Sequence, residues 1–137
     1  MKKALFICTH NSARSQMAEA LLPWLFPEYQ AFSAGTEVTR VNPYAIAAMA
    51  ELGLDLSTHR SKSIEEFRGE SFDYVITVCD SAQETCPYYP HSATSIHHSF
   101  SDPSRIQGTE EEVLAGFRQV RDQIIEWLKK TFSNPEL

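Results

Sequence analysis

The spacing of apolar positions changes several times along the chain, and these changes predict alternating strands and helices. Residues 4–7 form a short continuous apolar run, as buried strands do. Residues 72–78 form the strongest such run and are rich in β-branched side chains, which predicts a central strand of a parallel sheet. Weaker patterns of the same kind predict strands over residues 29–35 and 95–100.

Between these runs, apolar residues recur every three or four positions, which predicts helices. The first helix is expected over residues 16–26. A second should begin at Asn42 and Pro43, because asparagine caps helices well and proline fits the first helical position, and it should stop at Gly53. The last and clearest helix covers about residues 109–131 and starts with a threonine and a glutamate in capping-box positions.

Strands that alternate with helices favour a parallel sheet with right-handed crossovers. We expect residues 1–137 to form a single domain, because a chain of this length can bury one proper core. The predicted fold is therefore a single-domain α/β structure with a four-stranded parallel sheet flanked by helices. Ligands of such sheets bind beyond the carboxyl ends of the strands, and Cys8, Cys79 and Asp102 all follow predicted strands.

Composition narrows the classes of function. With 42% hydrophobic and 22% charged residues, the chain should be a soluble globular protein. No apolar run approaches the roughly 20 residues that span a bilayer, and the first run breaks at Thr9, too early for a signal peptide. We therefore expect a cytoplasmic protein without membrane contact. The net charge of −6 argues against nucleic-acid binding and means that any anion must be held by local groups.

The polar stretch after the first strand carries the most distinctive chemistry. Cys8 ends the strand, and helical spacing begins soon after Arg14. Loop and helix N–H groups in this setting attract anions and favour the thiolate form of a cysteine. Arg14 adds a planar fork of donors that matches two oxygens of a tetrahedral oxyanion. We therefore predict that Cys8 is a nucleophile and that the substrate oxyanion is bound by Thr9, His10, Asn11, Ser12, Ala13, Arg14 and Ser15.

A plainer interpretation of the same stretch stays open at this point. Cys8 would then be an inert cysteine buried at a strand end, and Ser12 or Ser15 would simply cap the helix that follows.

The chain has three cysteines, and an odd number in a cytoplasmic protein suggests chemistry rather than a disulfide framework. Cys79 and Cys86 would lie roughly 10 Å apart along the axis of a regular helix. A disulfide needs Cα atoms about 4.4–6.8 Å apart, so the segment between them would have to unwind or loop out. In the alternatives, both are unrelated core cysteines, or they join His91 in a zinc site, which lacks a close ligand pair. We expect no metal site.

A cysteine, five residues, an arginine and a serine follow one another in residues 8–15. This pattern resembles the phosphate-binding loop of the low-molecular-weight protein tyrosine phosphatases and of their relatives, the thioredoxin-coupled arsenate reductases. The Cys79 and Cys86 pair resembles the arsenate reductases specifically. The resemblance extends over essentially the whole chain and includes Gln16-Met17-Ala18-Glu19, Ser33-Ala34-Gly35, Val41-Asn42-Pro43 and Asp102-Pro103.

The resemblance implies a phosphatase-like fold, arsenate as substrate, thioredoxin as reductant and no cofactor. Cys8 would attack arsenate, Cys79 would then attack Cys8 and release arsenite, and Cys86 would attack Cys79, leaving a disulfide for thioredoxin to reduce. It also implies that Asp102 is the general acid, although an Asp-Pro pair alone is more often an ordinary turn. Asn11 and Ser15 would hold the loop and hydrogen-bond the sulfur of Cys8.

Some relatives bind potassium near this loop through residues that match Asn11, Glu19 and Ser33 and one acidic residue. Here Lys62 occupies the acidic position. We therefore expect the ammonium group of Lys62 to supply the positive charge in place of a metal ion.

Two other functions remain possible from the sequence. A low-molecular-weight phosphatase would hydrolyse phosphotyrosine or a small phosphomonoester with Cys8, Arg14 and Asp102. Such phosphatases usually carry aromatic residues after the Asp-Pro pair, where this chain has Ser104 and Arg105. A non-catalytic anion-binding regulator would leave the other two thiols without a role. We expect a monomer in each case.

Overall fold

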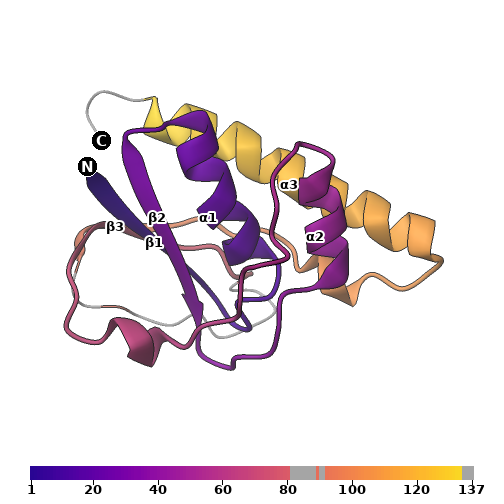
Figure 1. Cartoon of the computed structure of the whole chain (residues 1–137), viewed down its shortest axis with the longest axis horizontal. Coiled ribbons are helices and arrows are strands. Elements are labelled where there is room, and N and C mark those ends of the chain that lie inside the picture. Colours follow the sequence, from indigo (N-terminus) through magenta and orange to yellow (C-terminus); the bar gives the residue numbers. More distant parts are fainter. Residues whose placement is uncertain (81–88, 90–91, 134–137) are drawn as a thin grey trace.

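The computed structural model describes residues 1–80, 89 and 92–133 (Figure 1). Its strands are β1 (Lys2–Cys8), β2 (Tyr29–Gly35), β3 (Phe72–Thr77) and β4 (Ser92–His97). Its α-helices are α1 (Arg14–Leu25), α2 (Pro43–Ala50) and α3 (Glu110–Phe132), and two short 3₁₀ helices are η1 (Ile64–Phe67) and η2 (Pro103–Arg105). None of the helices in these described ranges has the length and apolar character needed to cross a membrane.

The four strands form one parallel sheet in the order β2-β1-β3-β4, which confirms the predicted fold class. The register brings the carboxyl ends of β1 and its neighbours to one edge. Cys8 pairs with Gly35 at the end of β2, and Ile7 pairs with Thr77 at the end of β3. Residues that follow β1 and β3 therefore leave the sheet side by side, at the carboxyl edge where open α/β sheets bind their ligands.

Both faces of β1 are buried, which explains its continuous apolar run. Alternate side chains of a strand point to opposite faces. Ala4 and Phe6 enter the larger core beneath the helices, whereas Leu5 and Ile7 enter a smaller core on the other face. Figure 1 shows α1, α2 and α3 together on one side of the sheet. Their largest fully buried side chains are Met17, Leu21, Leu22, Met49, Phe117, Ile124 and Leu128.

The smaller core on the opposite face is built from aromatic rings. Phe72 of β3 packs edge-on against Phe67 of η1 and against Tyr89, with ring centroids 5.8 Å apart in both pairs. The hydroxyl of Tyr89 lies 2.7 Å from the carbonyl oxygen of Phe67 and 2.6 Å from that of Glu70. Tyr89 is therefore a packing residue of this face.

Several element boundaries differ from those expected. The fourth strand covers Ser92–His97 instead of residues 95–100, because β3 ends at Thr77, the partner of His97, and offers no further pairing. The first helix begins at Arg14, two residues early. The second ends at Ala50, and its chain reaches Gly53 through a turn in which that glycine adopts a φ of 79°.

Candidate active site

The loop between β1 and α1 leaves the start of the helix open to an anion. The residue before the helix is Ala13, and it makes no side-chain capping bond. The first turn of α1 also contains no acidic side chain. Because the first N–H groups of a helix have no partner within it, they can bind an anion here. The interpretation of Ser12 or Ser15 as a simple cap is therefore wrong.

Cys8 is buried at the bottom of this loop and is a free thiol. Its sulfur lies 2.9 Å from Oγ of Ser15. The side-chain amide of Asn11 donates to the same Oγ at 2.7 Å, so the hydroxyl proton of Ser15 is available to the sulfur. A hydrogen bond donated to a thiolate stabilises the charged form, which is the nucleophilic form of cysteine.

Asn11 holds the shape of the loop. It is fully buried and has a φ of 53°, a left-handed conformation that asparagine tolerates better than most residues. Its Oδ1 accepts hydrogen bonds from the backbone N–H of Lys62 at 2.8 Å and from the amide of Gln16 at 2.9 Å. Its carbonyl oxygen accepts from the hydroxyl of Ser61 at 2.8 Å. The loop is thereby attached to residues 60–62.

Gln16 connects the loop to the residues packed against it, a role that the sequence pattern did not predict. It is fully buried on α1, and its amide also donates to the carbonyl of Arg60 at 2.8 Å. Its Oε1 lies 3.1 Å from Nδ1 of His59. The available signal for this role was a glutamine in the first turn of an amphipathic helix, just after the loop. A buried amide there needs hydrogen-bond partners.

The end of β2 approaches the loop so closely that only glycine fits. A Cβ atom on Gly35 would lie 2.6 Å from the carbonyl oxygen of Thr9. That oxygen accepts hydrogen bonds from the N–H groups of Thr36 and Glu37, both at 2.9 Å. The side chain of His10 stands at the rim, 42% exposed, with Nε2 at 3.8 Å from a carboxylate oxygen of Glu37.

Arg14 and Asp102 meet at the same edge although they are far apart in sequence. The guanidinium of Arg14 is 3% exposed and donates from Nη1 to the carbonyl oxygen of Phe100 at 3.2 Å. Its Nη2 lies 3.7 Å from Oδ2 of Asp102. The other oxygen of Asp102 accepts from the N–H of Ser104 at 3.0 Å and caps η2. Asp102 thus forms the Asp-Pro turn and also faces Arg14.

A cationic side chain lies behind the loop. Nζ of Lys62 is 3.4 Å from a carboxylate oxygen of Glu19 and 3.4 Å from Oγ of Ser33. The second carboxylate oxygen of Glu19 lies 3.1 Å from Nδ1 of His59. The ammonium group therefore sits among the side chains that the resemblance assigned to potassium. Within residues 1–80, 89 and 92–133, no cluster of three or more acidic, histidine or cysteine side chains could hold a metal ion.

Cys79 follows β3 at the same edge of the sheet as Cys8. It is fully buried and disulfide-bonded, whereas Cys8 is free. The N–H of Val78 donates to the carbonyl of Ile7 at 2.9 Å, which holds the chain on either side of these two cysteines together. Cys86 and His91 lie outside the described residues, as do residues 81–86, where the chain between Cys79 and Cys86 was expected to unwind or loop out.

Comparison with known proteins agrees with this arrangement. Residues 3–134 match the family model described as low molecular weight phosphotyrosine protein phosphatase. An arsenate reductase of Bacillus subtilis is 44% identical over 126 residues, which cover 91% of each chain. The solved structure of an arsenate reductase in the phosphate binding state has a TM-score of 0.82 and 34% identity, and the match covers 97% of this chain and 98% of that one.

A thioredoxin-dependent arsenate reductase from Corynebacterium glutamicum is also similar, with a TM-score of 0.65 and 26% identity over 98% of this chain and 64% of that one. The family match extends over nearly the entire chain and includes the loop from Cys8 to Ser15. The chain therefore belongs to the low molecular weight phosphotyrosine protein phosphatase family.

Proposed function

We propose that this protein reduces arsenate to arsenite by passing two electrons from its cysteines, and that thioredoxin restores them. The relatives named arsenate reductase, at 44% and 43% identity over about nine-tenths of the chain, support the substrate. The observation that carries the relay is the position of buried Cys79, two residues after the end of β3 and at the sheet edge where β1 ends in Cys8. Cys79 is disulfide-bonded beside a strand that ends in the free Cys8.

In the first step, the Cys8 thiolate attacks the arsenic atom of bound arsenate. The uncapped N–H groups at the start of α1 and the guanidinium of Arg14 hold the remaining oxygens. An S–As bond forms and an As–O bond breaks. Asp102 donates a proton to the departing oxygen, which leaves as water. Arsenic remains in the pentavalent state on Cys8.

In the second step, the Cys79 thiolate attacks the sulfur of Cys8. A disulfide forms between them, and the electron pair of the S–As bond passes to arsenic, which leaves as trivalent arsenite. The two electrons therefore come from the two sulfurs. The position of Cys79 two residues after the end of β3, next to β1, supports this direction of attack.

In the third step, Cys86 attacks Cys79 and displaces Cys8 as a thiolate. The resulting disulfide between Cys79 and Cys86 is then exchanged with the dithiol of thioredoxin. Oxidised Cys79 together with free Cys8 is the state that this step would leave. The proposal takes the protein to act as a monomer in the cytoplasm, where thiols are kept reduced.

A coupled assay tests the proposal. The protein is incubated with arsenate, thioredoxin, thioredoxin reductase and NADPH, and NADPH oxidation is followed for wild type and for Cys8→Ser, Cys79→Ser and Cys86→Ser. We expect turnover in the wild type and none in any variant. Hydrolysis of a phosphomonoester that depends on Cys8 alone, without arsenate reduction, would identify a phosphatase instead. A protein that binds arsenate and turns over neither substrate would be a regulator.

A further inference from the structure

The backbone carbonyl of Phe100 orients Arg14, yet Phe100 lies in neither a strand nor a helix. It follows β4 and precedes η2. Its carbonyl oxygen accepts the 3.2 Å hydrogen bond from Nη1 of Arg14, and Asp102 two residues later faces Nη2. Whatever fixes Phe100 therefore also fixes the direction in which the guanidinium presents its donors to an oxyanion.

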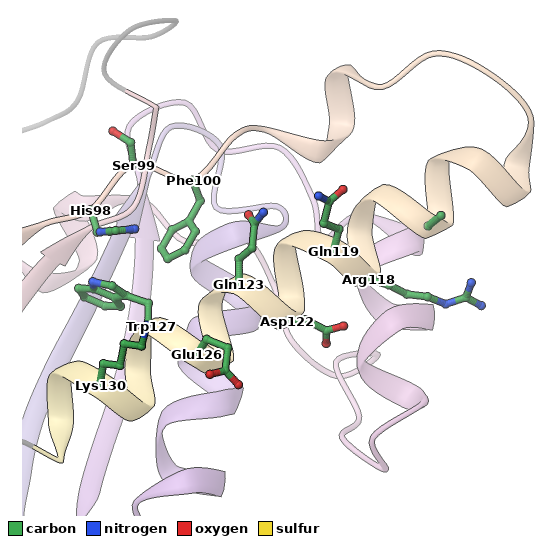
Figure 2. A pocket seen from close by; sticks show the side chains of 11 residues that line it. His98, Ser99, Phe100, Arg118, Gln119, Asp122, Gln123, Glu126, Trp127 and Lys130 are labelled. Atoms are coloured by element: carbon green, nitrogen blue, oxygen red, sulfur yellow. The ribbon is translucent and has the colours of Figure 1, made fainter.

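The ring of Phe100 is held by two neighbouring rings (Figure 2). It is 4% exposed and lies 4.7 Å from the ring of His98 and 6.0 Å from that of Trp127, edge-on at 82°. His98 and Trp127 also lie against each other, with centroids 5.1 Å apart. Partial desolvation of its ring, and next the neighbouring His97, lower the pKa of His98, although its side chain is exposed.

Open space borders the other side of this aromatic group. A groove of about 950 Å³ runs along α3 and is lined by Phe100, Trp127, Gln119 and Gln123, among others. Figure 2 shows the ring of Phe100 directed toward α3 beside this groove. Phe100 itself is only 4% exposed and belongs to the main core, so its packing comes from that core and from the rings of His98 and Trp127. Because Trp127 and Phe100 both line the groove, loss of the indole would leave empty space next to the ring of Phe100.

Trp127 itself stands on a rigid support. It belongs to α3, a helix of 23 residues whose Phe117, Ile124 and Leu128 are fully buried in the main core. Its ring also packs edge-on against that of Phe132, with ring centroids 6.4 Å apart. A fixed helix, an aromatic contact and a carbonyl thus connect the core to the guanidinium at the site.

We propose that Trp127 is a positioning residue of the oxyanion site, which acts through the ring and carbonyl of Phe100 on Arg14. This role extends the proposed function, on which it rests, by naming a residue that determines oxyanion affinity without touching the oxyanion. Trp127→Leu removes the aromatic restraint, Trp127→Phe keeps an aromatic face, and Val120→Ala removes buried apolar volume elsewhere on the same helix.

The test measures binding of inorganic phosphate to the reduced protein by calorimetry. Trp127→Leu should weaken binding about tenfold, equivalent to one hydrogen bond from a charged group. Trp127→Phe should stay within about twofold of wild type, and so should Val120→Ala although it lowers the melting temperature. In an Arg14→Lys background, Trp127→Leu should have little further effect, because the guanidinium fork is already lost.

Unchanged phosphate affinity in Trp127→Leu would overturn the proposal. Equal losses in Val120→Ala, or the same loss with and without Arg14, would also overturn it, since both would indicate general destabilisation. Phosphate binding needs no electron transfer, so the test decides the role of Trp127 whether or not the protein reduces arsenate.

Discussion

The sulfur of Cys8 depends on a short chain of buried donors. Ser15 lies 2.9 Å from the sulfur, and Asn11 donates to Ser15, which leaves the serine proton directed to the sulfur. The left-handed backbone of Asn11 and its bonds to Lys62 and Gln16 keep this chain in place. At the scale of single residues, the loop is therefore prepared for a thiolate before any substrate binds.

Ser15→Ala should slow the attack of Cys8 by roughly ten- to a hundredfold, because it removes one hydrogen bond to a charged group. The measurement is the rate of alkylation of Cys8 by iodoacetamide at neutral pH in protein whose other two cysteines are serine. Ser95→Ala, on exposed β4, is the control. A rate equal to that of the control would show that Ser15 does not support the thiolate.

Lys62 should make the protein independent of potassium. Its ammonium group already contacts Glu19 and Ser33, so an added cation would meet a like charge. We expect turnover to agree within about twofold between potassium chloride and sodium chloride of equal ionic strength. Weak ion effects at the protein surface account for differences of that size. Lys62→Ala should lower turnover, and exposed Lys129→Ala should not. Strong stimulation of the wild type by potassium would contradict this role.

At the scale of elements, the site is made by strand ends and a helix start. The spacing from Cys8 to Ser15 predicted the loop well, because a strand, a polar stretch and a helix must follow one another there. The beginning of β4 was not predictable, since Ser92, Ala93 and Thr94 carry no apolar alternation and face no core. The hydrogen bond from Arg14 to the carbonyl oxygen of Phe100, 86 positions away in sequence, was equally unpredictable. Every residue type has a backbone carbonyl, so the residue type gave no signal.

Gly35→Ala should disturb the loop through the end of β2. The added Cβ would lie 2.6 Å from the carbonyl oxygen of Thr9, which must shift. We expect the free energy of unfolding, measured in urea, to fall by about 1–3 kcal/mol, a typical cost of overpacking. Phosphate affinity should fall as well. Gly53→Ala is the matched control: its φ is 79°, but nothing lies within 4 Å of the new atom. Equal phosphate affinity in the two variants would contradict the close approach.

At the scale of the whole molecule, stability depends on burying both faces of a small parallel sheet. Aromatic rings do much of this, and Tyr29 of β2 packs against Tyr74 and Phe132 beneath the helices. Burial, and next the neighbouring Tyr74, raise the pKa of Tyr29 to about 12. Burial also raises the pKa of Tyr89 on the other face.

These tyrosines should make the fold sensitive to alkali. In the unfolded chain Tyr29 loses its proton near its ordinary pKa of 10.0, whereas the folded chain keeps it until about 12. The folded state binds more protons in this interval, so its stability falls as the pH rises from 10.0 to about 12. Urea unfolding across this range should show a shallower decline for Tyr29→Phe than for wild type. Parallel curves would show that Tyr29 titrates alike in both states.

The central claim is that arsenate takes its two electrons from the cysteines of this chain. The most direct measurement is a single turnover: fully reduced protein receives one equivalent of arsenate without thioredoxin, and arsenite and disulfide-linked peptides are quantified. We expect one arsenite per chain, a disulfide between Cys79 and Cys86 in the wild type, and one between Cys8 and Cys79 in Cys86→Ser. Arsenite formed without a disulfide, or no arsenite from fully reduced protein, would contradict the account.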